Sequence, residues 1–256
     1  MITRTWYMKF FVTGVYAFLY IPLLILMLFS FNAGMYVTDW AGFSLHWYQV
    51  VFASLETYTA LTNSLFVACC AVLLSVCMGA LYVFYAPLCG LRSLAGIFYI
   101  SLAIPEIILA ASLLGMFSML CVPLGLLTLI IGHTILGLGY VIPVLSARFE
   151  ELDSTLLEAS YDLGATKWQT FIYVALPFLA PSLIASALLV FIISLDDFIL
   201  SFLCTGASTQ TLPVYLFSLI RAGANSMVNV ISTLMVLAST CIVALFSWVE
   251  SRRRHV

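Results

Sequence analysis

Residues 158–177 read EASYDLGATKWQTFIYVALP, a polar and helix-prone stretch that runs directly into apolar sequence. Residues 154–155, Ser-Thr, precede it and can cap a helix that extends up to Gly164. Gly164 can end that helix and turn the chain, and Thr166 can start a second helix behind it. The stretch therefore predicts a helix–turn–helix knob, although an ordinary solvated loop with common caps remains an alternative.

Long apolar runs surround this knob on both sides. They occupy approximately residues 9–31, 58–84, 94–121, 124–147, 176–203 and 228–249. Each run is long enough to cross a bilayer as a helix, which needs about 20 apolar residues. The first is interpreted as a retained helix, because its apolar stretch exceeds a usual signal-peptide core. We therefore predict an all-α integral membrane protein with six transmembrane helices, in a single domain over residues 1–256.

The composition excludes several classes of protein. The 256 residues are 64% hydrophobic and 8% charged, whereas a soluble domain has about 45–50% apolar and about 25% charged residues. The chain therefore cannot cover a globule with polar side chains, and a soluble enzyme is ruled out. A net charge of −2 offers no phosphate-binding field, so we expect no nucleic acid partner. No P-loop and no metal-type ligand spacing is present, and we expect no metal site.

The cations predict how the chain crosses the membrane. With six spans and both termini in the cytoplasm, eight of the nine Lys and Arg residues lie inside and only Arg221 lies outside, as the positive-inside rule requires. The knob then belongs to the largest cytoplasmic segment, residues 148–175. Residues 32–57 form an outside loop, in which a short interfacial helix is expected to begin near Ser44. The C-terminal basic run 252–254 is expected to anchor at the lipid surface.

The knob resembles the cytoplasmic signature of permease subunits of binding-protein-dependent ABC importers. Ser160 and Val174 stand where that family usually has Ala and Ile, and Leu176-Pro177 closes the motif. The resemblance implies the type I ABC importer permease (MetI-like) fold, with coupling helices that dock on an ATPase subunit. It assigns ATPase docking to Glu158, Ala159, Ser160, Asp162 and Gly164.

Three carboxylates interrupt the apolar runs: Glu106, Asp196 and Asp197. A charged Asp at the centre of a membrane helix costs roughly 2.5–3.5 kcal/mol, so such groups are expected to line a pathway. No Lys or Arg lies between Arg92 and Arg148 or between Lys167 and Arg221 to neutralise them. Alternatively, an aspartate could cap a helix break or reach the outer interface, and Glu106 could be protonated and bonded to a neighbouring helix. Pro105 is expected to kink its span.

A narrower resemblance concerns the residues around these acids. Ser-Leu-Asp-Asp-Phe at 194–198, Pro-Glu-Ile-Ile at 105–108, and Thr205-Gly206 followed by Leu212-Pro213 resemble the permeases of spermidine/putrescine importers, most of all the shorter member of the pair. Polyamines need separated carboxylates for their ammonium groups and aromatic walls for their methylenes. The substrate-pathway residues are therefore expected to be Glu106, Ser194, Asp196, Asp197 and Trp47. Trp47 could instead belong to an interfacial aromatic belt.

The resemblance also implies partners and a location. It implies a homologous second permease, two cytoplasmic ATPase subunits and an extracytoplasmic substrate-binding protein in the bacterial inner membrane. ATP and Mg would be bound by the ATPase, so this chain is expected to hold no cofactor and no catalytic residue. Two alternatives stay open. One is the same machine for another small solute or cation, and the other is a stand-alone ion-coupled carrier whose acids relay ions.

Overall fold

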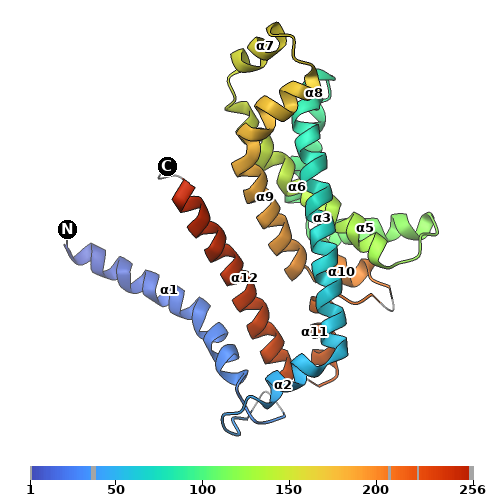
Figure 1. The fold of residues 1–256 in the computed structure, drawn as a ribbon. Coiled ribbons are helices and arrows are strands. Elements are labelled where there is room, and N and C mark those ends of the chain that lie inside the picture. Colours follow the sequence, from blue (N-terminus) through green and yellow to red (C-terminus); the bar gives the residue numbers. More distant parts are fainter. Residues whose placement is uncertain (1, 36–38, 207–208, 224, 254–256) are drawn as a thin grey trace. The chain divides into compact units, whose positions relative to one another are not determined.

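A computed structural model describes residues 2–35, 39–206, 209–223 and 225–253. It consists of two compact units, one formed by residues 1–58 with 215–256 and the other by residues 59–214. The regular elements in the described residues are helices (Figure 1), and an isolated bridge joins Asn32 to Phe43. The all-α prediction is confirmed.

The first unit contains α1 (Ile2–Phe29), α2 (His46–Ala53), the start of α3 (Leu55–Leu88), the end of α11 (Leu212–Arg221) and α12 (Ser226–Arg253). Helix α12 packs against both α1 and α2. The fully buried Asn32 organises the loop after α1, because its amide donates to the Asp39 carbonyl at 2.8 Å and accepts from the Ala41 N–H at 2.8 Å. The short helix predicted to begin near Ser44 is present as α2.

The second unit contains most of α3 and a run of helices that follow it. They are a 3-10 turn at Arg92–Leu94, α4 (Ala95–Ala103), α5 (Glu106–Met119), α6 (Leu126–Glu150), α7 (Ser154–Asp162), α8 (Lys167–Thr170), a π-helical turn at Phe171–Ala175, α9 (Leu176–Asp196) and α10 (Ile199–Cys204). Helix α6 packs against α4, α9 and α10, and α5 packs against α10. Helix α6 is therefore the centre of this unit.

Small residues let these helices approach closely. A Cβ added at Gly137 of α6 would lie 2.9 Å from the Ser75 Oγ of α3 and 2.9 Å from the Val190 Cγ1 of α9. Membrane helices associate through close van der Waals packing of this kind, because lipid removes the hydrophobic drive between them. The core beside this contact is aliphatic and aromatic, with Phe84 and Ile142 among its buried members.

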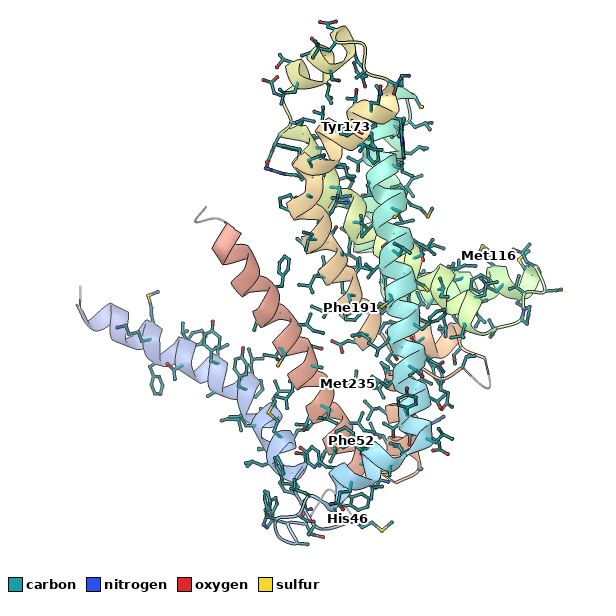
Figure 2. All side chains as sticks on the ribbon, in the orientation of Figure 1. His46, Phe52, Met116, Tyr173, Phe191 and Met235 are labelled. Carbon is teal, nitrogen blue, oxygen red and sulfur yellow. The ribbon has the colours of Figure 1, made fainter. Side chains whose placement is uncertain are left out.

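The helices long and apolar enough to cross a membrane are five among the described residues, and six if one bent pair is a single span. The five are Met8–Phe29, Leu55–Leu88, Leu126–Glu150, Lys167–Asp196 and Ser226–Ala244. The bent pair is α4 with α5, which meet at 116° across Ile104 and Pro105. The predicted kink at Pro105 is thus a sharp break, since proline cannot donate to the helix ladder. Figure 2 shows α5 carrying Met116 on the resulting arm.

Candidate functional site

The apolar run predicted as one span over 176–203 is divided at Asp197. Helix α9 ends at Asp196, Asp197 has an extended backbone, and α10 begins at Ile199. The Asp197 carboxylate accepts the N–H of Ser201 at 2.8 Å and that of Leu200 at 3.4 Å. These N–H groups would otherwise lack partners at the start of a helix. Asp197 therefore caps α10, which was one of the alternatives raised by the sequence.

A buried histidine joins both sides of this break. His133 of α6 is 1% exposed, and its Nδ1 lies 2.9 Å from the Ser194 hydroxyl of α9. Its Nε2 lies 3.1 Å from the Ser201 hydroxyl of α10 and 3.6 Å from Oδ2 of Asp197. A serine hydroxyl can donate or accept, so both ring nitrogens are satisfied. One imidazole thus holds three helices together.

Glu106 extends this cluster to the surface of a cavity. It is the first residue of α5, and its carboxyl group lies next to that of Asp197. Asp197 is buried, whereas Glu106 is only half-buried. Glu106 lines a cavity of about 70 Å³ together with Ser101, Tyr140 and apolar residues of α4, α6 and α9. Of these two neighbouring carboxyls, Glu106 is therefore the one that a ligand in the cavity can contact.

The structure brings together three of the five residues predicted for a substrate pathway. Ser194 and Asp197 lie against His133, and Glu106 lies next to Asp197. Asp196 is exposed on the last turn of α9 and lies outside that hydrogen-bonded group. Trp47 belongs to the first unit, where its indole N–H donates to the Gly34 carbonyl at 3.0 Å.

Sequence reasoning missed His133. The signal was present, because His133 is an ionisable residue inside an apolar run, and such residues are functional candidates in a membrane helix. Histidine counts as neutral in the net charge, so a search of the apolar runs for formal charges identifies the three acids and not His133.

The predicted knob is present as α7 and α8, with a cap different from the expected one. The Asp153 carboxylate, rather than Ser154 or Thr155, accepts the N–H of Thr155 at 3.0 Å. Hydrogen bonds from Thr155 hold the pKa of Asp153 below its usual range. Thr166 and Gln169 cap α8 reciprocally. The predicted helix–turn–helix is therefore confirmed, and the N-cap residue is corrected by one position.

The turn between the two helices depends on Gly164. Its φ is +82°, a left-handed conformation that costs a residue with a Cβ about 1–2 kcal/mol. The Gly164 N–H donates to the Tyr161 carbonyl at 2.9 Å, and the Ala165 N–H donates to the Ser160 carbonyl at 3.0 Å. This pair of bonds is a Schellman motif. The prediction that Gly164 ends the helix is confirmed.

The residues predicted to dock an ATPase differ in accessibility. Glu158, Ala159, Asp162 and Gly164 are exposed. Ser160 is half-buried, and its hydroxyl lies 2.8 Å from that of Thr170. Leu163 is 88% exposed and Leu156 is 53% exposed, so the knob also presents apolar side chains to its surroundings. Sequence reasoning did not single out these two leucines.

The base of the knob is held to the helices beside it. Arg148, near the end of α6, pairs with Glu151 and lies over the ring of Phe178 at 4.2 Å from its centroid. The Leu152 side chain that follows is buried. The end of α6, from which the chain enters the knob, is therefore joined to α9.

Comparison with known proteins agrees with this architecture. Residues 90–255 match the family described as binding-protein-dependent transport system inner membrane component. The chain is 34% identical over 94% of its length to the spermidine/putrescine transport system permease protein PotC of Haemophilus influenzae, covering 95% of that protein. It is also 34% identical, over 91% of its length, to the putrescine transport system permease protein PotI of Escherichia coli, covering 86% of it.

Solved structures share the fold. A chain of a bacterial ABC transporter involved in the import of the acidic polysaccharide alginate superposes with a TM-score of 0.74 at 16% identity, with 96% of each chain covered. A chain of the inward-facing MetNI methionine ABC transporter gives a TM-score of 0.61 at 18% identity, covering 77% of this chain and 97% of that one. The predicted importer permease fold is confirmed.

Proposed function

Since this chain belongs to the family of inner membrane components of binding-protein-dependent transport systems, we propose that it forms half of a pathway that imports polyamines. A homologous permease supplies the other half, two ATPase subunits bind the knob, and a soluble binding protein delivers the substrate. The chain is a transport subunit, and ATP and Mg act at its partner. Both termini lie in the cytoplasm, as the distribution of cations favours.

The observation that carries the substrate proposal is the carboxyl pair of Glu106 and Asp197. Two acids lie in contact within the helix bundle, and Glu106 opens onto a cavity. No Lys or Arg lies between Arg92 and Arg148 or between Lys167 and Arg221. A passing ammonium group supplies the positive charge that this part of the chain lacks. Relatives named for spermidine and putrescine transport support this chemistry.

The remaining predicted residues take complementary roles in this proposal. Asp196 is exposed on α9 and faces outward from the cluster, where the second permease completes the pathway. Ser194 holds the His133 ring and contributes its hydroxyl to the polar lining. Trp47 supplies an aromatic surface for the substrate, on which an ammonium group gains roughly 0.5–2 kcal/mol from a cation–π contact.

The knob transmits the motion of the ATPase. Glu158, Ala159, Asp162 and Gly164 form its exposed docking surface, and Ser160 braces α7 against α8. Closure of the two ATPase subunits moves the knob as a rigid body, and the contacts of Arg148 carry that motion into α6 and α9. Rigid-body switching of this kind is what alternating access requires.

The test is ATP-dependent uptake of labelled spermidine and putrescine into vesicles that contain this chain with its genomic neighbours. Wild type is expected to accumulate both substrates. Asp196→Asn is expected to reduce uptake with the complex still assembled. Glu158→Arg is expected to abolish uptake and to weaken copurification of the ATPase, because a reversed charge meets the docking cleft. Glu150→Arg reverses the same charge just before the knob and serves as its matched control.

Two results would overturn parts of the proposal. If the ATPase copurifies and no polyamine moves, the transporter carries a different solute. If no ATPase binds and uptake follows an ion gradient, the chain acts as a stand-alone carrier.

A further inference from the structure

His133 is placed to control the geometry of the break between α9 and α10. Its two ring nitrogens contact hydroxyls on opposite sides of that break, Ser194 at 2.9 Å and Ser201 at 3.1 Å. An imidazole is rigid and planar, so the two contacts fix the distance between the helix segments. The ring is almost fully buried, and water cannot substitute for either contact without a cavity being opened.

The same ring restricts the Asp197 carboxylate. One oxygen of Asp197 faces the Leu200 N–H, and the other accepts from the Ser201 N–H at 2.8 Å and lies 3.6 Å from the His133 Nε2. Both oxygens are therefore directed by neighbours. The Glu106 carboxyl lies next to that of Asp197 and lines the cavity, so the charge that Glu106 meets there depends on where these contacts hold Asp197.

From this chain of contacts we propose that His133 is a positioning residue for transport, which holds Asp197 so that Glu106 meets the substrate ammonium in the cavity. The inference rests on the proposed function and refines it. Glu106 touches the substrate, whereas His133 and Asp197 act through Glu106. The sequence assigns all three acids to the pathway, and the structure distinguishes them by burial.

The experiment compares two amides at position 133 in the assembled transporter. Asn places its amide near the Nδ1 position and Gln reaches toward the Nε2 position. Both the polyamine transported and the ATP hydrolysed are measured with loaded binding protein. His133→Asn is expected to lower the ratio of transported polyamine to hydrolysed ATP by about tenfold, as expected when the buried Ser201 hydroxyl loses its partner at Nε2. His133→Gln is expected to restore most of that ratio.

Thr134→Val is the matched control. Thr134 neighbours His133 on α6, but its hydroxyl donates to the Ile130 carbonyl of its own helix at 2.7 Å. The ratio of transport to hydrolysis is expected to stay at the wild-type value in this variant. A double variant of His133→Asn with Asp197→Asn is expected to be no worse than the poorer single variant, because both break the same chain of contacts.

Several outcomes would overturn the inference. An unchanged ratio in His133→Asn, or equal losses of transport and hydrolysis in both amide variants, would reduce His133 to a structural residue. If the His133→Asn variant fails to assemble, Ser201→Ala provides the test in its place. This variant removes the hydroxyl that contacts Nε2 and should lower the ratio of transport to hydrolysis by about threefold. An unchanged ratio would overturn the inference. A wild-type complex that hydrolyses ATP but moves no polyamine would instead reject the proposed substrate.

Discussion

The hydroxyl of Ser160 lies 2.8 Å from that of Thr170, and this contact fastens α7 of the knob to α8. Thr170 is fully buried, and α8 continues through a π-helical turn into α9. A force applied to α7 thus reaches the long helix α9 through a polar contact. The small side chain of Ser160 therefore packs inside the knob, and its size also lets a partner approach α7 closely.

Removal of the Ser160 hydroxyl should loosen the knob. Ser160→Ala leaves the buried Thr170 hydroxyl without this partner, which costs about 1–3 kcal/mol. Amide hydrogen exchange in α7 is expected to accelerate, and copurification of the ATPase to weaken. Ser154→Ala, at the exposed start of the same helix, should leave both measurements near wild type. Equal exchange rates in the two variants would show that the contact does not hold α7.

Substitution of Gly164 should disturb the turn of the knob. Gly164→Ala forces a Cβ into a left-handed backbone conformation, at a cost of about 1–2 kcal/mol. ATP hydrolysis stimulated by the loaded binding protein is expected to fall. Gly115→Ala in α5 is the control, since a Cβ there meets nothing within 4 Å and its φ is not positive. That substitution should stabilise the helix by about 0.4–1 kcal/mol. Similar effects at both glycines would contradict the role of the turn.

The capping role of Asp197 predicts an effect on stability. Asp197→Ala removes the acceptor for two N–H groups of α10, and loss of a cap costs about 1 kcal/mol. The thermal midpoint of the purified complex is expected to fall. Asp197→Asn keeps an oxygen at the cap, so the thermal midpoint should fall less in this variant. Transport should still be impaired, because the charge is lost. Asp196→Ala is exposed and should change the free energy of unfolding by less than about 0.5 kcal/mol. If Asp196→Ala destabilised the complex more than Asp197→Ala, Asp196 and not Asp197 would be the residue that caps α10.

The cap of α7 predicts a dependence on pH. Hydrogen bonds from Thr155 lower the pKa of Asp153 in the folded chain. A depressed folded pKa stabilises the fold above the unfolded pKa, and that contribution disappears as the pH falls through the folded value. Hydrogen-exchange protection at the start of α7 is therefore expected to decline on acidification below the usual aspartate range. Asp153→Asn should show no such decline, and a decline of equal size in that variant would assign it to another group.

The sequence determined most of the helical content, the positions of the apolar helices and the knob. These features depend on local chemistry. A run of about 20 apolar residues in lipid must satisfy its backbone within one helix, and caps such as Gly164 act within one turn of the chain. The cap of α7 was misplaced by one residue, because Asp153, Ser154 and Thr155 can all accept an N–H in that position.

Only the tertiary structure decided which polar groups meet. Ser194 and Asp197 could be read as pathway candidates from the sequence, but the contact of both with His133 joins residues about 60 positions apart along the chain. No local pattern determines that pairing, because it arises when α6 packs against α9 and α10 through small residues. Packing also explains why Asp197 is buried whereas Glu106 lines the cavity. The burial of a side chain depends on which helices the fold places around it.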